Sequence, residues 1–177
     1  MLKNIILWLG LVVAVWFITT QGALLRPQQR PPETVNSLQE NISDSAYLCW
    51  TGDCTAEQEP GKTLKNEDKI KVAHTAGQRE RGLSGTISLD PYAGMLFVFP
   101  EEGQYSFWMK DMNYPIDIVW ISAQKKIVHI ESAVQPKDFP KTYVSQDKAL
   151  YVLELPQGNA QQRGLSIGAP VDFYFIK

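Results

Sequence analysis

The feature that most limits the possible folds is a series of short apolar runs, separated by turn residues, between Asp68 and the C-terminus. Apolar runs of roughly four to eight residues bounded by Gly, Pro, Asn, Asp or Ser are typical of β-strands, because amphipathic helices need longer periodic stretches. The predicted fold class is therefore mainly β, a compact sandwich or partly closed barrel of about seven short strands. These strands are expected at residues 69–74, 94–99, 105–112, 116–121, 126–131, 149–155 and 171–176.

One or two short helices are expected between these strands. Thr75 and Gln78 have the spacing of a capping box, which predicts a helix that stops near the glycines at residues 82–85. A second helix of one or two turns is expected at residues 159–163, where Gly164 provides a C-terminal stop.

An apolar run without charged residues, at residues 5–18, precedes the β domain. Continued through residue 25 as a helix with a rise of about 1.5 Å per residue, it is about 31 Å long, enough to cross a bilayer core. We expect residues 1–25 to form an N-terminal transmembrane helix that contacts the membrane through residues 5–25. The alternative is a cleaved signal peptide, although Thr-Gln-Gly-Ala at residues 20–23 fits a small-residue cleavage site poorly.

The remainder of the chain divides into a polar spacer at residues 26–67 and a globular domain at residues 68–177. The spacer contains the only two cysteines, Cys49 and Cys54, which in an oxidising compartment would close a small disulfide loop. The alternative is two unrelated reduced thiols. The expected disulfide favours a single-pass protein of the cytoplasmic membrane with its C-terminal domain outside the cytoplasm, in the periplasm or at the cell surface.

The charge balance excludes one large class of partners. The chain has 17 Lys and Arg against 19 Asp and Glu, a net charge of −2. It therefore lacks the excess of basic residues with which proteins bind the phosphates of nucleic acids. No phosphate-binding glycine loop or metal-ligand cluster stands out, and neither histidine is placed with a serine in a recognisable catalytic motif. We therefore expect no nucleic-acid partner, no cofactor and no metal, and we assign no catalytic residue.

Several rare segments occur in order along the domain. They are RGLSG at 81–85, DP at 90–91, GMLFVF at 94–99, FWMK at 107–110, PID at 115–117 and YVLELP at 151–156, followed by Gly158, Gly164, Leu165 and Gly168. Over residues 70–177 this series resembles the bacterial and archaeal family called domain of unknown function 192. The resemblance implies a compact, mainly β domain in proteins that are often secreted or membrane-tethered. The family has no established activity or cofactor.

Five residues are candidates for a ligand-binding site: Arg81, Trp108, Lys110, Asp117 and Glu154. Trp108 and Lys110 share one face of their strand, where the indole could stack on a ring-shaped ligand; the alternative is that Trp108 packs beneath a loop. Asp117 and Glu154 lie within apolar strands. Because burying an unpaired carboxylate is costly, each should have a cationic or hydrogen-bonding partner, and Lys110 and Arg81 are the expected partners.

Three functions remain open from the sequence. The first is a binding module of the cell envelope that holds a saccharide or another envelope component beside Trp108. The second is a hydrolase acting on envelope polysaccharide, if Asp117 and Glu154 face each other across a cleft. The third is a structural or interaction scaffold, in which the same charges only stabilise the fold.

Overall fold

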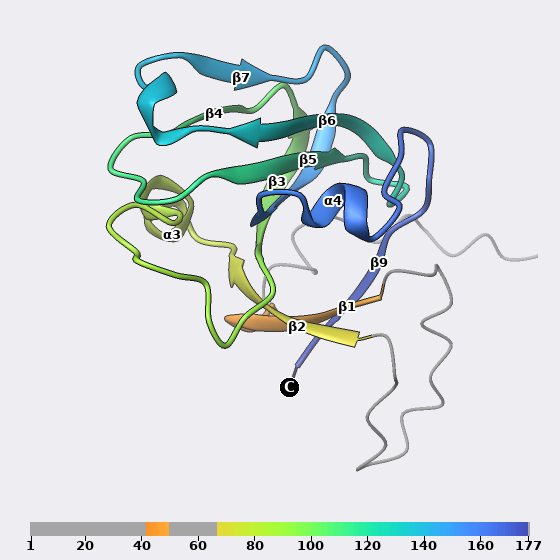
Figure 1. Ribbon diagram of the computed structural model, residues 1–177. Helices are drawn as coiled ribbons and strands as arrows, with labels where there is room; N and C mark the ends of the chain where they lie inside the picture. The colour runs from red at the N-terminus through yellow and green to blue at the C-terminus, as the bar shows by residue number, and fades with distance from the viewer. Residues whose placement is uncertain (1–41, 50–66, 177) are drawn as a thin grey trace, which may run out of the picture. The chain divides into compact units, whose positions relative to one another are not determined.

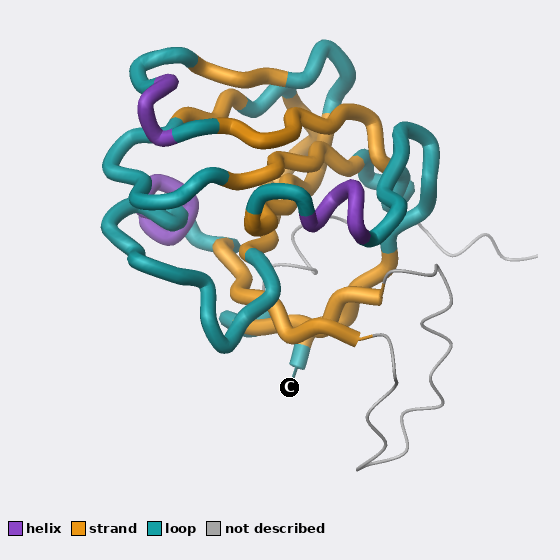
Figure 2. Tube along the Cα trace, viewed as in Figure 1, coloured by secondary structure: helices purple, strands orange, loops and turns teal. Residues whose placement is uncertain are grey.

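A computed structural model describes residues 42–49 and 67–176, which are mainly β with two short α-helices (Figures 1 and 2). The strands are β1 (Ser45–Cys49), β2 (Glu67–Ala73), β3 (Met95–Gly103), β4 (Ser106–Trp108), β5 (Ile116–Ile121), β6 (Ile127–Val134), β7 (Thr142–Val144), β8 (Ala149–Pro156) and β9 (Asp172–Phe175). The helices are α3 (Ala76–Arg81) and α4 (Asn159–Gln162), and a 3-10 turn spans Pro136–Asp138.

The predicted transmembrane helix at residues 5–25 lies outside the described residues, as does Cys54. Within the described ranges, none of the helices has the length and apolar character needed to cross a membrane. Cys49 is buried at the end of β1. The anchor and the Cys49–Cys54 disulfide stay predictions.

Seven of the strands form one sheet in the order β6-β5-β8-β3-β2-β1-β9, and β4 pairs with β7 in a separate two-stranded ribbon. All neighbours are antiparallel except β2 and β3, which are parallel and are connected through α3. A parallel pair needs such a crossover, because a tight hairpin can join only antiparallel strands.

The two edges of the seven-stranded sheet approach each other at one end. Lys126, just before β6, forms an isolated bridge with Pro170, just before β9. The Val171 amide donates to the Lys125 carbonyl at 2.8 Å, and the Ile127 amide donates to the Ala169 carbonyl at 3.0 Å. The sheet is therefore curled into a half-barrel. The predicted mainly β fold class is confirmed in this form, rather than as a two-sheet sandwich.

Both faces of the central strands are buried, which explains why β5 and β8 are apolar in sequence except for Asp117 and Glu154. One cluster contains side chains from all seven strands, among them Leu48, Val119 and Phe173, and so occupies the concave side. The second cluster covers the convex side. There Phe97 and Ile118 of the sheet pack with residues that follow α3 and with the β4–β7 ribbon.

The predicted element boundaries hold best in the middle of the sheet. β5 matches residues 116–121, and β8 extends the predicted strand by one residue. The prediction of one strand over residues 105–112 is wrong in its extent, because β4 ends at Trp108 and a turn follows in which Asp111 has a φ of 56°. β7 was not predicted, since only Tyr143 of its three residues is buried.

The folded unit begins earlier than residue 68. Residues 45–49, which the sequence placed in the polar spacer, form β1 between β2 and β9. Ala46 and Leu48 of this strand are completely buried in the concave core.

Two glycines allow neighbouring elements to approach each other closely around the convex core, because they have no side chain. Gly94 precedes β3, and a Cβ at this position would lie 2.6 Å from the Glu154 carbonyl oxygen of β8. Gly82 ends α3 with a φ of 49°, and a Cβ there would lie 3.2 Å from the Phe97 ring. The predicted capping box is present at the other end of α3, where the Gln78 amide donates to Thr75 Oγ1 at 3.2 Å.

Candidate functional site

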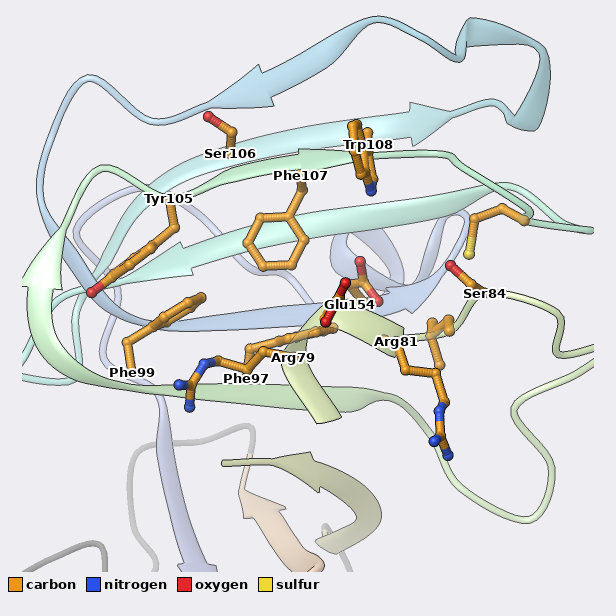
Figure 3. A pocket seen from close by; sticks show the side chains of 14 residues that line it. Arg79, Arg81, Ser84, Phe97, Phe99, Tyr105, Ser106, Phe107, Trp108 and Glu154 are labelled. Atoms are coloured by element: carbon orange, nitrogen blue, oxygen red, sulfur yellow. The ribbon is translucent and has the colours of Figure 1, made fainter. Parts of the chain in front are cut away.

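A cavity of about 290 Å³ opens on the convex side of the sheet (Figure 3). Its wall is built from α3 and the residues that follow it, from β3, from β4 and the residues on either side of it, and from Glu154 of β8. The lining residues are Arg79, Glu80, Arg81, Gly82, Leu83, Ser84, Phe97, Phe99, Tyr105, Ser106, Phe107, Trp108, Met112 and Glu154.

Glu154 is the buried acid of this cavity. It lies opposite Met95 of β3 and Ile118 of β5, and the strand alternation directs its side chain to the convex face. Only 4% of Glu154 is exposed, and its Oε2 atom is buried without a hydrogen-bond partner. Figure 3 shows the Glu154 carboxyl among the lining side chains, near the rings of Phe107 and Trp108.

Burial changes the protonation of Glu154. Desolvation raises the pKa of its carboxyl from the usual 4.5 to about 8, because the ionised form loses its hydration. At neutral pH the empty cavity therefore holds mainly the neutral carboxylic acid. A raised pKa in a cleft is a recognised mark of functional sites, and here it coincides with an unsatisfied polar atom.

Aromatic rings form most of the apolar wall. Phe107 makes an edge-to-face contact with Phe97, with ring centroids 4.9 Å apart, and Phe99 stacks on Tyr105 at 3.4 Å. The Trp120 indole nitrogen donates to the Tyr105 carbonyl at 2.9 Å and thereby ties the start of the β4 segment to the sheet. The rings are thus fixed by mutual packing before any ligand enters.

Trp108 lies at the exposed side of the cavity. It is 52% exposed, so the alternative that it packs beneath a loop is wrong. Its ring contacts Phe139 edge to face at 6.0 Å, and Phe139 is itself 44% exposed. An indole held in this way offers an accessible flat surface next to a buried carboxyl.

The two basic residues of α3, Arg79 and Arg81, occupy different positions relative to the cavity. Arg79 donates through Nη1 to the carbonyls of His74 and Val98, and its guanidinium lies 5.4 Å from the centroid of the Phe99 ring. Arg81 is exposed, and Figure 3 shows its guanidinium directed away from Glu154. Arg79 is therefore part of the wall, whereas Arg81 lies exposed at the rim.

The structure brings together three of the five predicted site residues, because Arg81, Trp108 and Glu154 line one cavity. Lys110 does not line it, but its ammonium nitrogen lies 6.0 Å from the centroid of the Trp108 ring. Asp117 lies elsewhere, in the concave core. Its exposure is 1%, and its carboxylate accepts hydrogen bonds from the amides of Ala133 at 2.9 Å and Ala160 at 3.0 Å.

Two expectations about the acids are corrected by this geometry. Among the described residues, neither Asp117 nor Glu154 forms an ion pair with Lys110 or Arg81. Asp117 is paired with Leu155 and Glu154 with Ile118, in an uninterrupted register, so the two acids point to opposite faces of the sheet. They form no carboxylate pair across a cleft.

The sequence did not identify the aromatic wall. Phe97 and Phe99 are two positions apart in β3, and Tyr105 and Phe107 are two positions apart in and before β4. This period of two places each pair on one face, and it is the signal that could have indicated an aromatic cavity. Arg79 carried no comparable signal, because its partners are backbone carbonyls.

The cavity offers no metal site of the usual kind. No group of three His, Cys, Asp or Glu side chains within residues 42–49 and 67–176 is placed to hold a metal ion. The cavity therefore offers one buried carboxyl, an aromatic wall and an exposed basic side chain, Arg81, at its rim.

The model of the family DUF192, described as "Uncharacterized ACR", matches residues 56–173, more than half of the chain. The chain belongs to the DUF192 family. The match covers the crossover through α3, the β4 segment and β8, and thus all parts of the cavity wall. The resemblance inferred from the motifs is confirmed.

Solved structures agree with this fold. A protein from Sinorhizobium meliloti, described as a candidate transcription regulator, is 28% identical, with a TM-score of 0.59 over 75% of this chain and 95% of that chain. A protein of unknown function from Novosphingobium aromaticivorans is 20% identical, with a TM-score of 0.57 over 72% of this chain and 83% of that chain. No curated protein matches the sequence.

Proposed function

We propose that this DUF192 protein is a binding module whose ligand enters the cavity between α3, β4 and β8. The observation that carries this proposal is the buried Oε2 of Glu154, which lacks a hydrogen-bond partner inside an aromatic cavity. An unsatisfied buried polar atom reduces stability, so a ligand that supplies the missing partner gains affinity from the same atom.

The geometry supports binding better than the other two functions. A hydrolase with two carboxylates needs both of them beside the same bond, and here Asp117 and Glu154 lie on opposite faces of the sheet. A purely structural role for Glu154 predicts a closed set of hydrogen bonds. Asp117 has such a set, and Glu154 does not.

The size and wall of the cavity favour a single ring with polar substituents. A volume of about 290 Å³ is at the lower end of ligand pockets. The half-exposed indole of Trp108 provides a flat apolar surface for stacking, as aromatic side chains do for sugar rings. We therefore propose a saccharide or a saccharide-containing envelope component as the ligand.

The proposed location is the outer side of the cytoplasmic membrane, with residues 5–25 as the anchor. Support comes from the uncharged apolar run at residues 5–18 and from the two cysteines. An envelope saccharide would be accessible to a domain tethered there.

Calorimetric titration with monosaccharides and oligosaccharides of envelope glycans tests the function. We expect Trp108→Ala to weaken binding on the order of tenfold, because stacking on an aromatic ring contributes about 0.5–1.5 kcal/mol. Glu154→Gln should weaken it as well. Matched controls are Ile167→Ala, which truncates another exposed apolar side chain, and Glu131→Gln, which makes the same change on β6. Equal affinities for all four variants and the parent protein contradict the proposal.

A further inference from the structure

The ligand group that reaches Glu154 can be specified from the other polar groups of the cavity. The Arg79 guanidinium already donates to two carbonyls, and the Ser84 hydroxyl donates to the Lys110 carbonyl at 2.9 Å. Glu154 Oε2 has no such partner. The buried unsatisfied atom among the lining residues is therefore a carboxyl oxygen, which accepts hydrogen bonds when the group is ionised.

The surroundings of this oxygen suit a positive charge. Aromatic faces attract cations, and a carboxylate beside them adds a charge-assisted hydrogen bond. Arg81 does not occupy this position, because its guanidinium is directed away from Glu154 (Figure 3). The charged and titratable groups that surround the cavity are Arg79, Glu80 and Arg81 of α3, Tyr105, Lys110 beside Trp108, and Tyr114, whose pKa is raised mainly by burial and further by Glu154.

We propose that the ligand carries an amine, and that its ammonium group binds the Glu154 carboxylate while its ring lies against the aromatic wall. This inference rests on the proposed function and narrows its substrate class to amine-bearing ligands, of which an amino sugar is the saccharide form. Arg81 at the rim, and Lys110 beside Trp108, could contact an anionic substituent at the opposite end of the ligand.

Such binding must exchange a proton. In the empty cavity the Glu154 pKa is about 8, so about nine in ten molecules hold the proton at pH 7. An ammonium group beside the carboxyl favours its ionised form and lowers this pKa. Each binding event at pH 7 should therefore release about one proton to the buffer. The affinity should rise about tenfold per pH unit between pH 5 and 7, as long as the ligand amine stays protonated.

Three sugars with the same ring provide a matched test on the full-length protein. Glucosamine carries a free amine, N-acetylglucosamine carries an uncharged amide in its place, and glucose carries a hydroxyl. Calorimetry at pH 6 and 7, in two buffers of different ionisation enthalpy, measures both affinity and proton release. We expect glucosamine to bind at least tenfold more tightly than the other two sugars, with release of about one proton. Glu154→Gln should remove both the preference and the proton release.

Two further probes separate this inference from the saccharide function. Cyclohexylamine and cyclohexanol differ in the amine alone and contain no sugar. Binding of cyclohexylamine without binding of any sugar supports the amine site and rejects the saccharide function. Equal binding of glucosamine and N-acetylglucosamine, or binding of glucosamine without proton release, rejects the amine site and keeps the saccharide function. Absence of binding by all five compounds overturns both. None of these outcomes depends on the folding of a variant.

Discussion

Two buried acids within one protein illustrate how differently a carboxylate can be accommodated. The sequence correctly indicated that Asp117 and Glu154 lie among apolar residues, but the expectation of cationic partners was wrong for both. Asp117 is satisfied by backbone amides of β6 and α4. Backbone donors leave no mark in the sequence, so residue types alone could not distinguish a satisfied acid from an unsatisfied one.

Glu154→Gln should change how stability depends on pH. Between pH 4.5 and 8 the folded protein keeps the Glu154 proton and the unfolded chain releases it. Stability therefore falls as pH rises, by at most about 1.4 kcal/mol per pH unit from this group. The variant lacks the group and does not lose this stability, so the difference in free energy of unfolding, variant minus parent, should be several kcal/mol larger at pH 8 than at pH 5. Urea unfolding at both pH values measures this difference, and parallel pH profiles would count against an unpaired Glu154.

At the scale of elements, the central strands were predictable and the peripheral ones were not. β5 and β8 are buried on both faces, so apart from Asp117 and Glu154 their residues form apolar runs between turn signals. β7 buries a single side chain, so it carries too little apolar sequence to be recognised. β1 does carry a short apolar run at residues 46–49, but this run is flanked by polar segments and was assigned to the spacer with them. The cavity depends in part on this peripheral structure, because β4 of the β4–β7 ribbon contributes Phe107 and Trp108 to its wall.

Gly94→Ala should disturb the β3–β8 contact on which Glu154 depends. The new Cβ would lie 2.6 Å from the Glu154 carbonyl oxygen and 2.9 Å from Leu155 Cδ2, so the strands must move apart. We expect a loss of about 1–3 kcal/mol in the free energy of unfolding, as for other overpacked cores, together with weaker ligand binding. Gly77→Ala in α3 is the control, since no atom lies within 4 Å of its added Cβ. It should leave stability unchanged or slightly higher, and equal losses for both variants argue against the steric explanation.

At the scale of the whole molecule, short apolar runs sufficed to predict a mainly β domain that is partly closed. They could not predict the strand order, because β9 pairs with β1 across more than a hundred residues of sequence. Contacts of this kind depend on the complete three-dimensional arrangement. The same limit applies to the site, whose residues come from α3, β3, β4 and β8.

The proposed anchor has a direct test in the full-length chain. Residues 5–25 form a helix of about 31 Å if they are helical throughout, long enough to span a bilayer core. We expect the protein to sediment with membranes, to resist extraction by alkaline carbonate, and to dissolve in detergent. Removal of residues 1–30 should transfer it to the aqueous fraction. Recovery of the intact chain in the aqueous fraction, with its first thirty residues verified by mass spectrometry, excludes the anchor.

The place of β1 in the sheet sets a lower limit on the piece of this protein that can be excised. The family match begins at residue 56, after β1 has ended, yet β1 is the strand that separates β2 from β9. A fragment trimmed to the match would lack β1 and the second half of β9, and would expose the backbone of β2, an open template for intermolecular aggregation. The autonomous unit of this protein therefore includes Ser45–Cys49, even though that strand lies outside the region by which the family is defined.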